Sequence, residues 1–141
     1  MFKEITQIIP HRHPMIMIDG YQRTSDDSAL SEKRFRAEDY GCSNGTVVDS
    51  ILIECLAQTV AAHHGHKALQ EKKIEPAMGM LVTVDTFDFF HPVPEDATIS
   101  ISIEKTDQIG PFNIMKGEIT LKGKLMARGQ IKIYNPENEP G

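Results

Sequence analysis

The chain has 141 residues, a net charge of −5, and a composition of 40% hydrophobic and 25% charged residues. This size and balance are typical of one globular domain that buries a core without disulfides or a structural metal. An acidic chain without a cluster of Lys and Arg does not favour nucleic acid as a partner, because phosphate binding needs a basic face. No apolar run reaches the length that crosses a bilayer.

The N-terminus and the cysteines indicate the compartment. The first ten residues lack the basic start and apolar stretch of a signal peptide. The only cysteines are Cys42 and Cys55, and Cys55 lies in an apolar stretch that is typical of a core position. We therefore expect a cytoplasmic protein with no membrane association. We also expect one domain over residues 1–134 and a flexible tail over residues 135–141, which is polar and carries two prolines.

The first third of the chain predicts a short helix and two strands. Met1–Ile9 is compatible with a helix that Pro10 ends. Met15–Tyr21 is apolar and predicts a strand, and Ala29–Arg36 predicts a second, more polar strand at an edge or with one face in water. Thr24–Ser28, rich in Asp and Ser, predicts the turn between them.

One long helical pattern follows, from about Val47 to Glu71, and it contains no proline. Its first half is apolar nearly all round, which is typical of a helix that is buried on most sides. Its second half, from His63 onward, is polar and is expected to emerge into water.

The remainder of the chain predicts strands in a meander. The runs are rich in β-branched residues or alternate between apolar and polar residues. They are separated by turns at residues 91–96, at Gly110-Pro111 and at Lys122-Gly123. The four predicted strands are Met78–Phe90, Thr98–Lys105, Asn113–Leu121 and Leu125–Tyr134. Strands on both sides of a single apolar helix predict an α+β fold in which a curved antiparallel sheet wraps around the helix.

Four segments, in order, give the chain its resemblance to the bacterial 3-hydroxyacyl-acyl-carrier-protein dehydratases. Ile9–Asp19 resembles the P-H-R-x-P segment and first strand of that family, and Glu54–Thr59 resembles its helix motif E-x-x-A-Q. Phe89–Asp96 resembles its F-x-x-P-V-x-P-G-D turn, and Gly117–Ala127 resembles its final hairpin. The resemblance covers nearly the whole chain and implies the hotdog fold. It is nearest to the divergent branch of aryl-polyene pigment synthesis.

The resemblance implies removal of water from a 3-hydroxyacyl thioester carried on acyl carrier protein, in fatty acid or polyene-type biosynthesis. In the family, a histidine takes the proton next to the thioester carbonyl, and a carboxylate on the buried helix helps the hydroxyl to leave. The two groups come from different subunits. The phosphopantetheine thioester arrives as part of the substrate, so we expect no separate cofactor. The implied partners are acyl carrier protein and other subunits, as a homodimer, a higher homo-oligomer or a heterodimer with a homologue.

Glu54 matches the carboxylate position and is the lone acid in the apolar run Ile51–Ala62. An unpaired buried carboxylate costs free energy, so this group is expected to be paired, to be protonated or to face a cavity. Gln58 lies one helical turn later on the same face and is a candidate for binding substrate. The alternative is that Glu54 is paired with a buried partner and only stabilises the fold.

The histidine of the family pattern is missing. Counting back fourteen positions from Glu54 leads to Tyr40, and Asp39–Asp49 contains neither histidine nor proline. A tyrosine is a poor base near neutral pH but can donate a hydrogen bond to a carbonyl or hydroxyl group. We therefore take Tyr40 and His13 as further candidates for a catalytic role. His11 and His91 are weaker ones. His11 also occurs in the family and is expected to pack or to form hydrogen bonds there.

Two other groups of residues have a structural and a functional interpretation. Ser43–Thr46 is a plausible start of the helix, where Asn44 or Thr46 caps the backbone amides. In the functional interpretation Asn44, Gly45 and Thr46 bind substrate, because those amides face the thioester oxygen. Lys33, Arg34 and Arg36 either receive the acidic carrier protein or form a solvated strand face.

His63, His64 and His66 suggest a metal site at first sight, but no Asp, Glu or Cys accompanies them at ligand spacing. We therefore expect no metal and interpret the cluster as a solvated helix end.

Three functions remain open from the sequence. The first is a dehydratase that acts on 3-hydroxyacyl groups carried on acyl carrier protein. The second is a hotdog thioesterase, in which the carboxylate on the helix directs water at the thioester. The third is a catalytically incomplete subunit that supplies Glu54 and pairs with a homologue that carries the histidine.

Overall fold

The computed structural model describes residues 1–71 and 80–134. It contains one α-helix, α1 (Asp49–Gln70), and a short 3₁₀ helix, η1 (Ile5–Gln7). The strands of the main sheet are β1 (Gly20–Arg23), β2 (Ser28–Arg34), β5 (Met80–Phe89), β6 (Thr98–Ile109), β7 (Phe112–Leu121) and β8 (Lys124–Tyr134). Two further short strands, β3 (Cys42–Ser43) and β4 (Thr46–Val47), form a separate hairpin.

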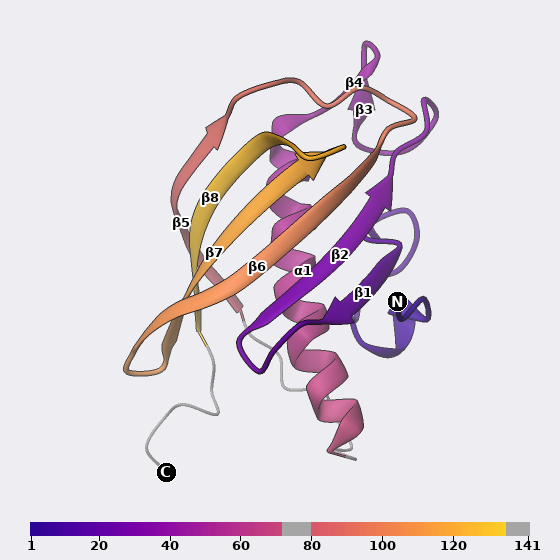
Figure 1. The fold of residues 1–141 in the computed structure, drawn as a ribbon. Coiled ribbons are helices and arrows are strands. Elements are labelled where there is room, and N and C mark those ends of the chain that lie inside the picture. The colour runs from indigo at the N-terminus through magenta and orange to yellow at the C-terminus, as the bar shows by residue number, and fades with distance from the viewer. Residues whose placement is uncertain (72–79, 135–141) are drawn as a thin grey trace.

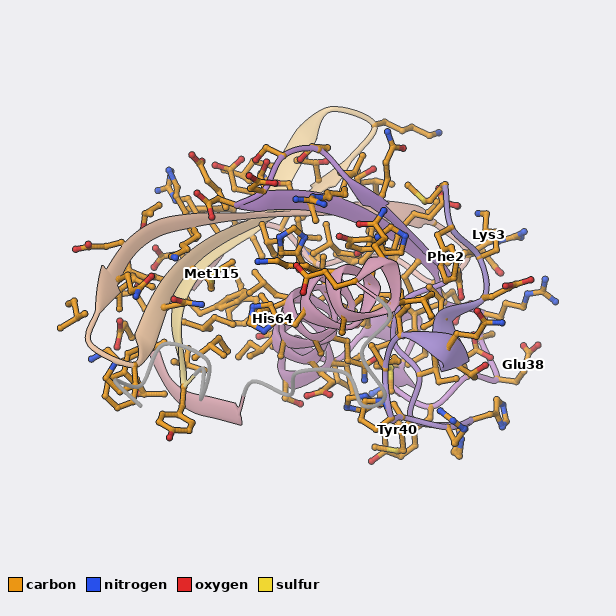
Figure 2. All side chains as sticks on the ribbon, turned by 90° about the horizontal axis from the view of Figure 1, so that it is seen from below. Phe2, Lys3, Glu38, Tyr40, His64 and Met115 are labelled. Carbon is orange, nitrogen blue, oxygen red and sulfur yellow. The ribbon has the colours of Figure 1, made fainter. Side chains whose placement is uncertain are left out.

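The main sheet is antiparallel between all neighbours and has the order β1-β2-β6-β7-β8-β5. Its long strands curve, and α1 lies across the concave side (Figure 1). Figure 2, which looks along the helix, shows the sheet arching over α1. This arrangement is the predicted hotdog fold, α+β with one central helix.

The strand pattern explains how the sheet covers the helix. In β6 the alternate residues Ile99, Ile101 and Ile103 are buried in the core. In β7, Gly117 faces the helix so closely that a Cβ atom there would lie 1.8 Å from Cδ1 of Leu56. The absence of a side chain at Gly117 therefore lets α1 approach the sheet. The turn at Lys122-Gly123 is also as predicted, with positive φ at both residues.

The long helix was predicted from Val47 to Glu71 and is observed from Asp49 to Gln70. Most of its residues between positions 52 and 68 are buried, as expected for an apolar helix. One stripe is only half-buried: Glu54, Ala57, Ala61 and His64. The stripe follows the i, i+3, i+7, i+10 spacing of one helix face.

The N-terminal region differs from the prediction. The expected helix over Met1–Ile9 is reduced to the single 3₁₀ turn Ile5–Gln7. The first strand begins at Gly20, whereas Met15 was the predicted start. The physical reason is that the backbone N–H of Met17 and the carbonyl of Met15 form hydrogen bonds with the side chain of Gln58. These groups are therefore not available to a neighbouring strand.

The second predicted strand lies inside the sheet, between β1 and β6. It is therefore not an edge strand. Its other predicted feature is confirmed, because Ala29 and Ser31 are buried while their neighbours along the strand are more exposed.

The prediction that Ser43–Thr46 begins the helix is wrong. Asn44 and Gly45, with φ of 54° and 84°, form the two-residue turn of the β3–β4 hairpin. An Asn-Gly pair is well suited to that turn because both central residues need positive φ. The helix begins after Val48, which makes no side-chain capping hydrogen bond.

The predicted solvated helix end begins later than His63, since Lys67, Leu69 and Gln70 are exposed. His63 is only 5% exposed and lies against Tyr21 of β1. Gly65, on the same helix, lets α1 approach the N-terminal segment closely, because a Cβ atom there would lie 1.8 Å from the carbonyl oxygen of Ile8. The helix therefore remains in contact with the N-terminal segment almost to its end.

Within the described residues, no helix is long and apolar enough to span a membrane. The predicted tail, residues 135–141, and the first two residues of the predicted strand Met78–Phe90 lie outside the described residues.

Candidate active site

Glu54 lies on the half-buried stripe of α1, and its side chain is 36% exposed. Its carboxylate oxygen Oε1 accepts a hydrogen bond of 3.0 Å from Nε2 of Gln58, one turn further along the helix. The carboxylate is therefore neither fully buried nor without a partner. Of the three situations expected for a lone acid in an apolar helix, it shows two, because it is paired and it also faces a cavity.

The side chain of Gln58 is held in one orientation by its hydrogen bonds. It is 1% exposed, and its side-chain oxygen accepts the backbone N–H of Met17 at 2.7 Å. Its Nε2 donates both to the carbonyl of Met15, at 2.8 Å, and to Glu54. Since the oxygen is committed to an N–H donor, the amide group has one orientation, and its NH₂ group faces Glu54. Gln58 thereby holds the carboxylate in place.

His11 lies on the other side of Glu54. Its Nε2 is 3.5 Å from Oε1 of Glu54, and its side chain is 31% exposed. Its Nδ1 is buried and has no hydrogen-bond partner among the described residues. From the sequence, His11 was expected to pack or to form hydrogen bonds, and His13 was the preferred catalytic candidate. The P-H-R motif before the first strand was the only signal in the sequence that pointed to His11.

The three side chains share a cavity of about 140 Å³. For scale, one molecule of liquid water occupies about 30 Å³. The small side chains of Ala57 and Ala61 leave this space open along the helix stripe. The residues that line it are His11, Glu54, Ala57, Gln58, Val60, Ala61, His64 and Ile133. A carboxyl group and an imidazole at the wall of one cavity can together move a proton to and from a bound molecule.

Tyr40 and His13 lie elsewhere. Tyr40 is 57% exposed, and in Figure 2 it lies at the lower edge of the view, apart from His64 on α1. Both residues line a second, more open cavity of about 530 Å³. The residues around it are His13, Pro14, Ile16, Lys33, Phe35, Glu38, Asp39 and Tyr40. The structure thus brings Tyr40 and His13 together, but neither lines the cavity at Glu54.

The remaining candidates also lie outside the Glu54 cavity. The carbonyl of Gly45 accepts the N–H of Glu95 at 2.9 Å, which ties the β3–β4 hairpin to the turn after β5. The hydroxyl of Thr46 donates to the carbonyl of Ser43, and Asn44 is exposed at the tip of the hairpin. His91 is exposed, and its backbone N–H donates to Met126. These contacts give the hairpin a structural role.

Lys33 and Arg34 each have an acidic neighbour. Nζ of Lys33 lies 3.2 Å from Asp19, and the Arg34 guanidinium lies 3.7 Å from Asp96. These acidic neighbours offset the positive charge proposed to receive a carrier protein.

In the described part of the chain, no group of three or more His, Cys, Asp or Glu side chains is placed to hold a metal ion.

Curated relatives of the chain are dehydratases. It is 26% identical over 135 residues to the 3-hydroxyacyl-[acyl-carrier-protein] dehydratase FabZ of Clostridium botulinum strain Loch Maree, covering 91% of this chain and 90% of the relative. It is 28% identical over 133 residues to the FabZ of Macrococcus caseolyticus, covering 86% of this chain and 83% of the relative. The match extends over nearly the whole of both chains.

Solved structures support the fold. The dehydratase heterocomplex ApeI:P of Xenorhabdus doucetiae superimposes with a TM-score of 0.82 at 20% identity, covering 94% of this chain and 90% of that chain. The PaaI protein of the Escherichia coli phenylacetic acid degradation operon gives a TM-score of 0.66 at 14% identity, covering 82% and 81%. Residues 3–140 match the family described as ApeP-like, ApeP dehydratase. This match spans almost the entire sequence, and the chain therefore belongs to the ApeP-like dehydratase family.

Proposed function

We propose that this chain removes water from a 3-hydroxyacyl thioester carried on acyl carrier protein, with Glu54 acting on the leaving hydroxyl. The observation that carries the proposal is the Glu54 carboxyl group, held by Gln58 at the wall of a cavity on the central helix. The FabZ relatives, named for this reaction, support the same substrate class.

The chemistry needs an acid and a base in one small space. The base removes a proton from C2, which the thioester carbonyl makes acidic. A protonated Glu54 gives its proton to the hydroxyl on C3, which leaves as water. Gln58 favours this role because its NH₂ group fixes one carboxyl oxygen and leaves the other for the substrate. The acyl group arrives on its phosphopantetheine arm, so the proposal includes no separate cofactor.

The direct test uses the purified chain alone. It is incubated with a 3-hydroxyacyl thioester and, separately, with the matching enoyl thioester, each on acyl carrier protein. Mass spectrometry follows the loss or gain of water, and a thiol reagent follows free phosphopantetheine. Interconversion without thiol release supports the dehydratase. Thiol release without interconversion contradicts it and supports a thioesterase.

A second candidate function is a subunit that is incomplete alone. One observation favours it: counting back fourteen positions from Glu54 leads to Tyr40, where the resemblance implies a histidine. The similar ApeI:P structure is described as a heterocomplex, which fits pairing with a homologue. In this case the chain alone has no activity, and dehydration begins when a homologue that carries the histidine is added.

A further inference from the structure

The environment of His11 combines an unsatisfied buried ring nitrogen, which His66 also has, with a neighbouring carboxylate. Its Nδ1 is buried without a hydrogen-bond partner among the described residues, while Nε2 faces the Glu54 carboxylate. A ring that only stabilises a fold normally has its buried nitrogen satisfied, because an unsatisfied buried polar group costs roughly 1–3 kcal/mol. In addition, no acceptor at Nδ1 fixes the tautomer, so either nitrogen can carry the proton.

The backbone around His11 is held firmly. The guanidinium of Arg12 donates to the carbonyl of Ile9 at 3.1 Å and to that of His11 at 2.7 Å. Pro10 precedes the ring and restricts the backbone before it. The segment that carries the imidazole is thus positioned by the residues next to it, although the ring itself has an unsatisfied nitrogen.

The distance between the imidazole of His11 and the carboxyl group of Glu54 allows both groups to contact a bound substrate. Nε2 and Oε1 are 3.5 Å apart, which is long for a hydrogen bond between them. Both side chains are about one third exposed and both line the cavity of about 140 Å³. A bound molecule that enters this cavity therefore meets the imidazole and the carboxyl group side by side.

We infer that His11 is the catalytic base that works with Glu54 of the same protomer, an inference that rests on the proposed function. Neutral His11 accepts the C2 proton on Nε2, and the electron pair of the C–H bond becomes the C2=C3 double bond. The C3–O bond breaks, and the leaving oxygen takes the proton of Glu54 to form water. The pair is left as imidazolium and carboxylate. Transfer of the proton from Nε2 to Glu54 restores the starting state.

His13 provides a matched control, because it is exposed and lines the second cavity. It is replaced by Gln, as is His11, because Gln keeps a polar side chain of similar reach that cannot act as a base. We expect His11→Gln to lose at least 100-fold in turnover and His13→Gln to remain within about threefold of the unmodified chain. Circular dichroism and melting temperature show that each variant is folded.

A second variant distinguishes catalysis from packing. His11→Ala leaves space beside Glu54, and added imidazole is expected to raise its turnover at least tenfold. A folded His11→Ala variant that does not respond to imidazole would overturn the inference.

Mixing two inactive variants tests whether the pair lies in one protomer. His11→Gln and Glu54→Gln chains are unfolded together and refolded, so that mixed oligomers form. A pair within one protomer predicts no recovery, because no chain has both groups. Recovery to about a quarter of normal turnover or more would overturn the inference, since it requires groups from two chains.

The inference and the proposed function fail in different ways. A His11→Gln variant that stays active while Glu54→Gln is inactive overturns the role of His11 and leaves the dehydratase intact. Turnover only after a histidine-bearing homologue is added also overturns the role of His11. Release of thiol without any loss of water overturns the proposed function itself.

Discussion

His63 on α1 and His11 in the segment that packs against α1 have opposite environments. His63 is buried, and both of its ring nitrogens have partners at 2.7 Å, the hydroxyl of Tyr21 and the carbonyl of Asp26. His11 has one nitrogen toward Glu54 in a cavity and the other without a partner among the described residues. The first environment fixes one tautomer, whereas in the second Nδ1 has no acceptor among the described residues.

The His63 contacts determine where its proton lies. The carbonyl of Asp26 can only accept, so Nε2 of His63 carries the hydrogen and Nδ1 accepts from Tyr21. Burial raises the pKa of Tyr21 to about 12, so its hydroxyl remains a donor at neutral pH. Burial also lowers the pKa of His63, ahead of the opposing effect of its hydrogen bond to Asp26. A histidine satisfied in this way stabilises the fold and is a poor proton carrier.

The largest expected effect is on turnover, in Glu54→Gln. The amide keeps the shape of the side chain and its contact with Gln58 but cannot supply a proton to the leaving hydroxyl. We expect a loss of about 10²- to 10⁴-fold in turnover, the usual contribution of a general acid or base. The melting temperature should stay within a few degrees of the unmodified chain. Turnover retained in a folded Glu54→Gln variant would contradict the role of Glu54.

The next effect is on stability, and it compares the two histidines directly. His63→Ala removes a buried ring and leaves Tyr21 and Asp26 without their partner, so we expect a loss of about 2 kcal/mol. His11→Ala removes a partly exposed ring with an unsatisfied nitrogen, and we expect a loss of about 0.5 kcal/mol or less. Urea unfolding measures both. Equal losses of unfolding free energy would show that burial and hydrogen bonding do not distinguish His63 from His11.

A smaller effect is the dependence of stability on pH. Burial lowers the pKa of His63 and His66 in the folded state below the ordinary value of 6.5. Below pH 6.5 the unfolded chain therefore binds more protons than the folded chain, and acid favours unfolding. We expect the free energy of unfolding to be maintained above pH 7. From about pH 6.5 downward it should fall by up to about 1.4 kcal/mol per pH unit for His63, and by less for the more exposed His66.

A variant of His63 provides the control for the measurement of stability against pH. Arg23 and Lys67 lower the pKa of His63 further, while Asp27 raises it. The His63→Gln variant cannot titrate at this position, so its unfolding free energy should fall less steeply between pH 6.5 and 5. Identical slopes for the variant and the unmodified chain would exclude His63 as a source of the acid sensitivity.

The smallest effect is expected from Tyr40→Phe. The ring stays, and only a hydroxyl in a cavity separate from that of Glu54 is lost. We expect turnover within about threefold of the unmodified chain in a steady-state assay. A loss above tenfold would show that Tyr40 reaches the substrate, and it would weaken the distinction between the two cavities.

The local features of the fold could be predicted from the sequence. The apolar stretch of α1, the alternation in β6 and the Lys122-Gly123 turn each have a local cause. The Glu54–Gln58 face also follows from helical spacing alone. The predicted strand start at Met15 failed because Gln58, more than 40 residues later, binds the backbone there. A hydrogen bond of that kind leaves no periodic pattern in the sequence.

The partners of the histidines could not be predicted for the same reason. His63 meets Tyr21 across 42 residues, and His11 meets Glu54 only because the loop before β1 packs against the helix. In sequence, His63 belongs to a polar run and His11 to a loop, so neither position indicated the contacts that the structure shows. The tertiary contacts, and not the local pattern, distinguish the structural histidine from the one at the candidate site.

The most direct test of the central claim is hydration of an enoyl thioester on acyl carrier protein by the purified chain in heavy water. Mass spectrometry locates the added deuterium. If Glu54 and its neighbouring base act together, the product is a 3-hydroxyacyl thioester with one non-exchanging deuterium at C2, and Glu54→Gln forms none. Free thiol as the only product, or the same labelled product formed at the same rate by Glu54→Gln, would contradict the account.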